Sequence, residues 1–409
     1  MTESFHTVII GGGVLGCSAA IALARRLGPR GNICIVDKTI VGAGLSSRNS
    51  GIVRAVDDRS SGAAMVARAT EAWKNLEDLW GVTVPLEKTG ALWITPAESD
   101  TAAPWRQWIS ELSAAGIRID SVDSHQAAGF AEAGIYLDET ERCYFEADAL
   151  TLDPGQLLQA TQEAIGNSGI VLKERTETVG FETDGTGRIR AVKTSRGDLQ
   201  CEFVVNAASA WGSRLFSSLG IAIPVALVPA YVAHWLVGSG EIAEHLPIVG
   251  DFVDRACFRR WSGRQIRMHQ PRDRSSSAIA RTFSSGSTRS TEADIIFESS
   301  NYFSHHGLLQ RYQEQLRHRF PKVGEPIFAG GFISYFDITP DLRCILGPDN
   351  HVANLIHCLG AGIGLKFAPF FGELISEAIL NGHLPAEMEE CSIARFGGRP
   401  IEEFLDLES

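Results

Sequence analysis

The stretch that decides the fold is VIIGGGVLGCSAAIALARR, residues Val8 to Arg26. An apolar, β-branched run precedes a cluster of glycines, and an alanine-rich segment follows it, so the sequence predicts a buried strand, a tight turn and a helix. Gly11, Gly13 and Gly16 have the spacing of the G-x-G-x-x-G fingerprint, with Ala19 as an accepted variant of glycine. Such a turn brings backbone N–H groups and the positive end of a helix to a pyrophosphate.

An acidic residue ends the next predicted strand. Asn32 to Lys38 reads NICIVDK and contains Asp37, 26 residues after Gly11. A carboxylate at this strand end accepts hydrogen bonds from ribose hydroxyls and repels a 2′-phosphate, which argues against NADP. The order strand, turn, helix, strand, acid favours a dinucleotide site over a structural glycine turn, but the fingerprint alone does not separate NAD from FAD.

Composition narrows the class of protein. The 409 residues suffice for two or three domains, and the formal net charge of −12 argues against a nucleic-acid partner. The eight cysteines form no CxxC pair and suggest no disulfide framework, and we predict no metal site. With no secretory signal and no apolar run of the ~20 residues that span a bilayer, the sequence predicts a soluble cytoplasmic protein.

Two further regions are rich in glycine. Thr39 to Val56 is a glycine- and serine-rich loop with two arginines, which can wrap a pyrophosphate or can be an ordinary solvated loop. Near the C-terminus, Leu355 to Leu380 predicts a strand, a second glycine turn and a helix. This turn offers another close approach of backbone to a flat ligand; its glycines are Gly360, Gly362 and Gly364.

These segments together resemble the FAD-dependent D-amino-acid-oxidase superfamily, most closely its sarcosine-oxidase and glycine-oxidase branch. The resemblance is carried by Val8–Arg26, Val36–Arg54, Phe203–Trp211 and Ile333–Leu380. It implies an α/β fold with a Rossmann-like FAD-binding domain and an antiparallel-sheet, α+β substrate domain. The chain departs from the family at Ser209, where glycine is frequent, and at Ser334, near the position of the covalent flavin cysteine. We therefore expect noncovalent FAD.

The resemblance also implies which residues contact FAD. They are Gly11, Gly13, Val14, Gly16, Asp37, Lys38, Ser46, Ser47, Arg48, Asn49, Gly51, Ala207, Gly360, Gly362, Gly364 and Lys366.

The predicted domains are discontinuous. Residues 1–85, 146–225 and 326–390 are assigned to the FAD-binding domain, residues 86–145 and 226–325 to the substrate domain, and 391–409 to a C-terminal tail. Asp153 and Pro154 predict the N-cap and first position of a helix. We interpret Arg272 to Thr291, which is rich in serine and arginine, as a loop over the substrate domain rather than a nucleic-acid tail.

The resemblance places four residues at the substrate. Arg54 and Lys366 correspond to the two cations that hold a substrate carboxylate. The alternative is that Arg54 is a surface cation and Lys366 binds a flavin oxygen only. His269 corresponds to an active-site histidine. Gln265 occupies the position of the lysine that activates oxygen; because an amide is neutral, either O2 or another electron acceptor fits the sequence, and Arg264 or Arg267 are candidate substitutes.

The sequence therefore predicts oxidation of the C–N bond of an amino acid, foremost a secondary or N-alkyl one, by hydride transfer to flavin N5. The partner would be a small carboxylate-bearing amine. Primary amino acids, glycine or D-amino acids remain alternatives, as does an FAD-binding electron-transfer subunit without a substrate. An NAD-dependent dehydrogenase would need a third strand after Asp37 and would leave the second glycine turn without a role.

Overall fold

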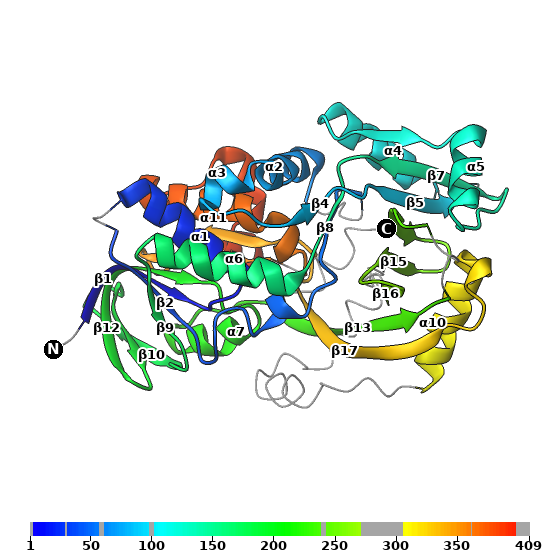
Figure 1. The fold of residues 1–409 in the computed structure, drawn as a ribbon. Helices are drawn as coiled ribbons and strands as arrows, with labels where there is room; N and C mark the ends of the chain where they lie inside the picture. Colours follow the sequence, from blue (N-terminus) through cyan, green and yellow to red (C-terminus); the bar gives the residue numbers. More distant parts are fainter. Residues whose placement is uncertain are drawn as a thin grey trace.

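The computed structural model describes residues 3–28, 31–56, 61–97, 102–238, 243–270, 306–360 and 362–397. The predicted loop Arg272 to Thr291 lies outside these residues. Three sheets form in the described part of the chain: two of eight strands and a small one of three. Figure 1 shows the two large sheets side by side, with the N-terminal strand in the first and the yellow helix α10 (His306–Arg319) against the second.

The first sheet is built around the opening strand β1 (Glu3–Ile10), whose last four residues are buried. β1 pairs in parallel with β2 (Ile33–Val36) and with β12 (Gly197–Asn206). The other strands extend this parallel core on both sides; they are β9 (Val171–Lys173), β10 (Thr178–Thr183), β11 (Ile189–Thr194), β18 (Ile345–Pro348) and β19 (Leu355–Leu359). This is the predicted Rossmann-like half of the molecule.

Helices cover the first sheet because their alanine- and leucine-rich faces bury against it. α1 (Val14–Leu27) packs against α11 (Gly364–Asn381), and both belong to one large buried cluster. In Figure 1 they lie with α6 (Pro154–Asn167) on the same side of the sheet. Asp153 caps α6 by accepting from the N–H groups of Gly155 and Gln156, as its position before Pro154 predicts.

The second sheet is mostly antiparallel. Its order is β17 (Ile327–Ile338), β13 (Ala226–Leu236), β16 (Gln265–His269), β15 (Ala256–Arg260), β14 (Ile248–Asp251), β5 (Ala91–Pro96), β7 (Glu141–Glu146) and β6 (Ile119–Ser121), with only β14 and β5 parallel among these pairs. The fold class predicted from the sequence is thereby confirmed.

One predicted boundary is corrected by the pairing of β17. This strand falls within the segment 326–390 assigned to the FAD-binding domain, yet it pairs along its length with β13 of the second sheet. The chain therefore returns to the first sheet only after Ile338. A third sheet joins the two halves; its strands are β3 (Ile52–Val53), β8 (Leu150–Leu152) and β4 (Leu86–Glu87).

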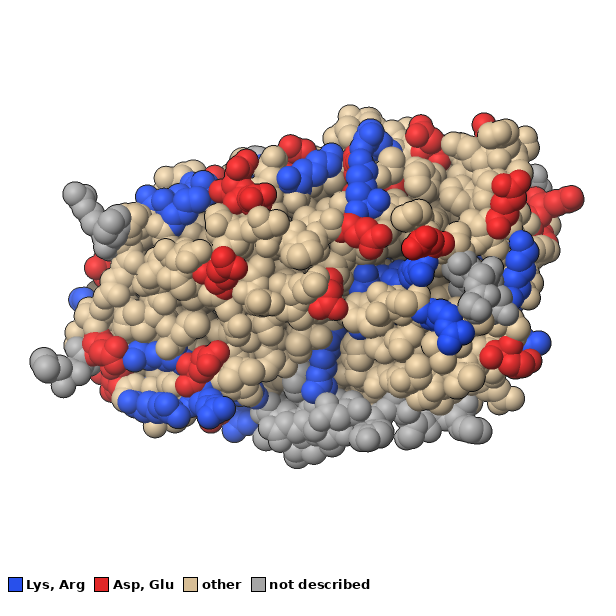
Figure 2. All heavy atoms as spheres, in the orientation of Figure 1, with Lys and Arg blue, Asp and Glu red and all other residues tan. Residues whose placement is uncertain are grey.

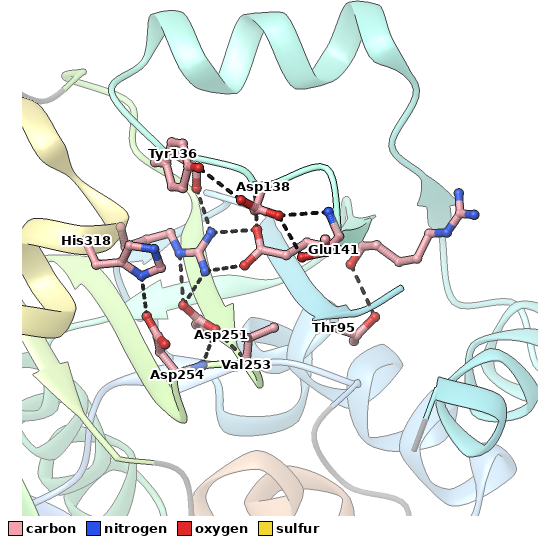
Figure 3. Close-up of polar contacts among 11 residues, drawn as sticks. Thr95, Tyr136, Asp138, Glu141, Asp251, Val253, Asp254 and His318 are labelled. Carbon is pink, nitrogen blue, oxygen red and sulfur yellow. Dashed lines mark hydrogen bonds and ion pairs between the residues drawn. The ribbon is translucent and has the colours of Figure 1, made fainter. Parts of the chain in front are cut away.

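A buried ion-pair network fixes α10 to the second sheet. The guanidinium of Arg319, 0% exposed, donates to both carboxylate oxygens of Glu141, to Asp251 and to the Tyr136 carbonyl oxygen. Figure 3 shows the carboxylates of Glu141 and Asp251 converging on this point, with the pair of Asp254 and His318 beside it. Because every donor of the buried cation has a partner, this network is structural in character.

One face of the molecule carries charged side chains of both signs (Figure 2). On the face drawn in Figure 2, basic and acidic side chains alternate over the surface instead of collecting in one patch. Among the residues that the structure describes, no helix combines the length and apolar character that crossing a bilayer requires.

Candidate active site

One large cavity connects the segments that the sequence analysis singled out. Its volume is about 870 Å³, near the upper end of the range for small-molecule and cofactor sites. It is lined by both glycine turns, the loop before β3, the middle of β13, the last residue of β16 and the C-terminal part of β17. The predicted site residues that line it are Gly11, Gly13, Val14, Asp37, Lys38, Ser46, Arg48, Asn49, Arg54, Ala207, His269, Gly360, Gly362, Gly364 and Lys366.

The first glycine turn leaves no room for side chains. Gly11 has φ +106°, and a Cβ built on it would lie 2.4 Å from the carbonyl oxygen of Ala207, where β12 ends. A Cβ at Gly16 would lie 2.0 Å from the carbonyl oxygen of Gly11, so Gly16 packs the helix against the turn instead of lining the cavity. This backbone therefore forms a cradle at the N-terminus of α1, the arrangement that binds a pyrophosphate.

Two side chains complete the rim of this cradle. Asp37 accepts hydrogen bonds from the Gly12 N–H (2.8 Å) and, with its other oxygen, from Thr39, which fixes its carboxylate at the cavity wall. Ser46 accepts from the Val14 N–H at 2.9 Å and so lies directly over the helix N-terminus. Ser47 is not among the described lining residues; its hydroxyl bonds back to the Gly44 carbonyl oxygen.

The second glycine turn is tied to the first sheet through Asp337. This carboxylate accepts from the Gly362 N–H at 2.7 Å and from the Ser209 hydroxyl at 2.8 Å. Ser209 has φ +50°, a conformation that favours glycine, which explains why the resembled family has glycine there. In this chain the hydroxyl compensates by holding the turn that faces the cavity.

Two cations from distant segments line the cavity near Ala55. Arg54 follows β3 and its Cζ lies 5.9 Å from the centroid of the Trp93 ring. Lys366, 6% exposed, lies in the first turn of α11 and donates from Nζ to the Ala55 carbonyl oxygen at 3.2 Å. The indole N–H of Trp73 binds the Lys366 carbonyl oxygen at 2.7 Å, which holds this turn of the helix.

His269 lines the same cavity from the last position of β16. Burial, followed by the nearby charges of Arg54, Arg267 and Arg259, lowers the pKa of His269 to about 3. The imidazole is therefore neutral at physiological pH, so it presents one hydrogen-bond donor and one acceptor.

Gln265 lies apart from His269. It lies at the opposite end of β16, across from Leu236, and is not among the described residues that line the cavity. Arg264 is exposed. Arg267 is buried, stacks 3.2 Å from the centroid of Trp261 and donates to the Asn49 carbonyl oxygen at 3.2 Å, so it contacts the loop that lines the cavity.

Gly51 also lies outside the lining, with a different role. A Cβ at Gly51 would lie 2.2 Å from the Leu152 carbonyl oxygen and 2.8 Å from the guanidinium of Arg259, which itself binds that carbonyl at 3.0 Å. Glycine at this position lets the loop pass close to β8 and to a buried arginine. Burial lowers the pKa of Arg259 to about 10.

Several lining residues were missed by the sequence analysis. At one end these are Trp211, Arg214 and Ser218, and on β17 they are Tyr335 and Phe336. Trp211 could have been predicted as a lining residue, because it ends the segment Phe203–Trp211 that resembles the family. In the structure, Lys38 Nζ lies 4.9 Å from the centroid of its ring. Ser334, near which the resemblance places the family's covalent cysteine, lines the cavity, whereas Cys344 is buried in the core.

Comparison with known proteins agrees with this geometry. A family model described as FAD dependent oxidoreductase (DAO) matches residues 6–378. The chain is 21% identical over 405 residues to the mitochondrial pyruvate dehydrogenase phosphatase regulatory subunit of Mus musculus, covering 96% of this chain and 43% of that protein. It is also 21% identical over 405 residues to 4-methylaminobutanoate oxidase (formaldehyde-forming) of Paenarthrobacter nicotinovorans, covering 96% of this chain and 46% of that one.

A solved structure has the same fold. L-proline dehydrogenase from P. horikoshii superposes with a TM-score of 0.79 at 20% sequence identity, covering 97% of this chain and 98% of that one. The chain spans about half the length of the two curated relatives described above.

Proposed function

Because the chain belongs to the DAO family of FAD-dependent oxidoreductases, we propose that it oxidises the C–N bond of an amino acid whose carboxylate is held by Arg54 and Lys366. FAD, the cofactor of this family, supplies the two-electron acceptor chemistry. In this proposal the first sheet and its helices form the cofactor domain, and the second sheet forms the substrate domain.

A single observation carries the proposal: both cations line the cavity that also contains the two glycine turns. A carboxylate between them would gain two charge-assisted contacts, which are stronger than contacts between neutral groups. The glycine cradle fits FAD, because the first glycine turn and the N-terminus of α1 line the same cavity, and a helix N-terminus favours the negative charge of a pyrophosphate. A purely structural subunit has no need for such a pair of cations.

Other residues that line the cavity hold the amine. His269, kept neutral by burial, can hydrogen-bond an amine without competing with it for positive charge. Ser334 stands where a thiol would be needed for a covalent flavin link, which supports a noncovalent cofactor. With the carboxylate and amine both held, the α-C–H bond has one orientation in the cavity, and orientation is the protein's main contribution to such a step.

We further propose a secondary or N-alkyl amino acid as the substrate. Among the relatives described above, one is named for a methylamino acid and another for proline, a cyclic secondary amine. Primary amino acids, including glycine and D-amino acids, are the competing substrates within the same reaction class.

One comparison favours a second function. The similarity to a phosphatase regulatory subunit extends over 96% of the chain, so an FAD-binding subunit without a substrate of its own is the alternative. The two functions differ in whether bound flavin can be reduced by a small amine.

The test is a visible spectrum of the purified protein, followed by anaerobic titration with N-methylglycine, L-proline, glycine and D-alanine. We expect a flavin spectrum that bleaches with at least one secondary amine. A protein that binds FAD but is bleached by none of these, or by a wider panel of N-alkyl and D-amino acids, would support the subunit instead. Turnover of the reducing substrate with O2 and with a dye then identifies the type of acceptor.

A further inference from the structure

We propose that Glu146 is a positioning residue for the carboxylate-binding pair, acting through the backbone of Ala55. The inference rests on the proposed function, because it concerns the same pair of cations. Glu146 is the last residue of β7 in the second sheet and is 1% exposed. None of the sequence motifs includes it, and it is not among the described residues that line the cavity.

The carboxylate of Glu146 gathers three N–H donors. One oxygen accepts from the Ala55 N–H at 2.7 Å, and the other accepts from the Trp93 indole N–H at 3.0 Å and the Val56 N–H at 3.4 Å. A carboxylate is the one side-chain group of this size that accepts at both of its ends. Glu146 thereby fixes the two peptide groups that directly follow Arg54.

Ala55 is held from both sides as a result. Its N–H binds Glu146, and its carbonyl oxygen accepts from Lys366 Nζ at 3.2 Å. Rotation of the backbone at this residue would break both bonds at once. The orientation of Ala55 therefore determines where the Lys366 ammonium lies relative to Arg54.

A second link reaches Arg54 through Trp93. Glu146 fixes the indole, and the guanidinium of Arg54 lies 5.9 Å from the centroid of that ring. The Trp108 indole N–H adds a bond to the Val56 carbonyl oxygen at 2.8 Å, which restrains the segment further along. Both cations of the pair are thus linked to one buried carboxylate, Lys366 through the backbone of Ala55 and Arg54 through the ring of Trp93.

Glu146→Gln separates this role from simple space filling. Glutamine has nearly the same shape, but its NH2 group cannot accept a hydrogen bond. In either amide orientation an NH2 donor faces the Ala55 N–H or the Trp93 and Val56 N–H groups, so a buried donor loses its partner. The variant should shift the backbone at Ala55 while leaving the surrounding apolar contacts in place.

The experiment measures ligand binding to the FAD-loaded protein by perturbation of the flavin spectrum. Benzoate and acetate are the carboxylate probes, and benzamide and acetamide are their neutral counterparts. We expect Glu146→Gln to weaken the binding of at least one carboxylate by about tenfold or more and to change binding of the matching amide by less than about twofold. Trp93→Phe, which keeps one aromatic ring but removes the N–H together with part of the indole volume, should weaken carboxylate binding in the same direction.

Glu141→Gln is the matched control. Glu141 lies on the same strand and its side chain is 3% exposed, but it serves the Arg319 network shown in Figure 3. This variant should lower thermal stability and leave carboxylate binding unchanged, which separates loss of stability from loss of positioning.

The outcomes distinguish the two proposals. Wild-type protein that holds FAD but binds neither carboxylate would contradict the carboxylate-binding pair and, with it, this inference. Carboxylate binding in wild type that survives in both Glu146→Gln and Trp93→Phe would overturn the role of Glu146 alone. Equal weakening of carboxylate and amide would also overturn it, because the defect would then not concern the cations.

Discussion

Lys366 Nζ donates a hydrogen bond to the carbonyl oxygen of Ala55 over 3.2 Å, across a sequence separation of 311 residues. This contact holds the first turn of α11 against the end of β3, and Arg54 is the residue directly after β3. The two cations proposed to bind the substrate carboxylate are neighbours only because these elements pack together.

Replacing Arg54 with alanine should weaken binding of a carboxylate substrate by roughly 2–5 kcal/mol, as for loss of one member of a buried charge pair. The change should appear mainly in KM and in the Kd of carboxylate inhibitors. Arg25→Ala is the control, because Arg25 pairs with Glu373 on the surface and its side chain is 44% exposed. An Arg54→Ala protein with unchanged affinity would contradict the proposed grip on the carboxylate.

Gly11→Ala should abolish FAD binding, since the new Cβ would lie 2.4 Å from a backbone oxygen of Ala207. Gly28→Ala is the matched control: Gly28 also has a positive φ, +60°, but a Cβ there meets nothing within 4 Å. The ratio of flavin to protein absorbance measures the result. If both variants retained FAD equally, the close approach of the turn to β12 would not be what shapes the cofactor site.

Gln265→Lys should leave the rate of the reaction with O2 unchanged within about twofold. We expect this although the resemblance places an oxygen-activating lysine at this position. Gln265 and His269 lie four residues apart on an extended strand, which is about 13 Å, and Arg267 lies between them on the same face. Oxygen consumption measured with saturating reducing substrate checks this, with Gln265→Met as a control for size. A large increase only in the lysine variant would show that position 265 reaches the flavin.

The stability of the folded chain should fall as pH decreases below about 6.5, and His269 should contribute to the fall. The folded-state pKa of His269 is lowered to about 3, so between these values the unfolded chain binds a proton that the folded chain does not. The free energy of unfolding should therefore rise with pH in this window, by up to about 1.4 kcal/mol per pH unit for one such group.

Urea unfolding at several pH values between 4.5 and 7.5 measures this slope. His269→Gln should make it shallower, whereas a substitution of the exposed His125 should not change it. Part of the slope will remain in the His269 variant, because burial also lowers the pKa of His234 to about 4. An equal slope in the wild-type protein and in His269→Gln would contradict the lowered pKa of His269 in the folded protein.

Much of the fold followed from local patterns. The glycine spacing predicted the turn that Gly11 makes, and Asp153 with Pro154 predicted the start of α6, because cap and turn residues act on their immediate neighbours. The predicted domain boundary at residue 326 was wrong because local patterns do not determine which strands pair. An apolar run predicts that a strand such as β17 exists, but it does not say which sheet the strand joins.

The sequence by itself predicted the glycine turn at Gly11 from residue types at short, fixed spacings, and the resemblance of its motifs indicated the family and named Arg54 and Lys366 as the candidate cations. Only the tertiary structure decided that Arg54, Lys366 and His269 share one cavity, that Gln265 lies outside its lining, and that Glu146 holds the backbone between the cations. The physical reason is that contacts across hundreds of residues arise from packing of whole sheets and helices. No local spacing encodes where a buried carboxylate on one sheet will meet a loop of another.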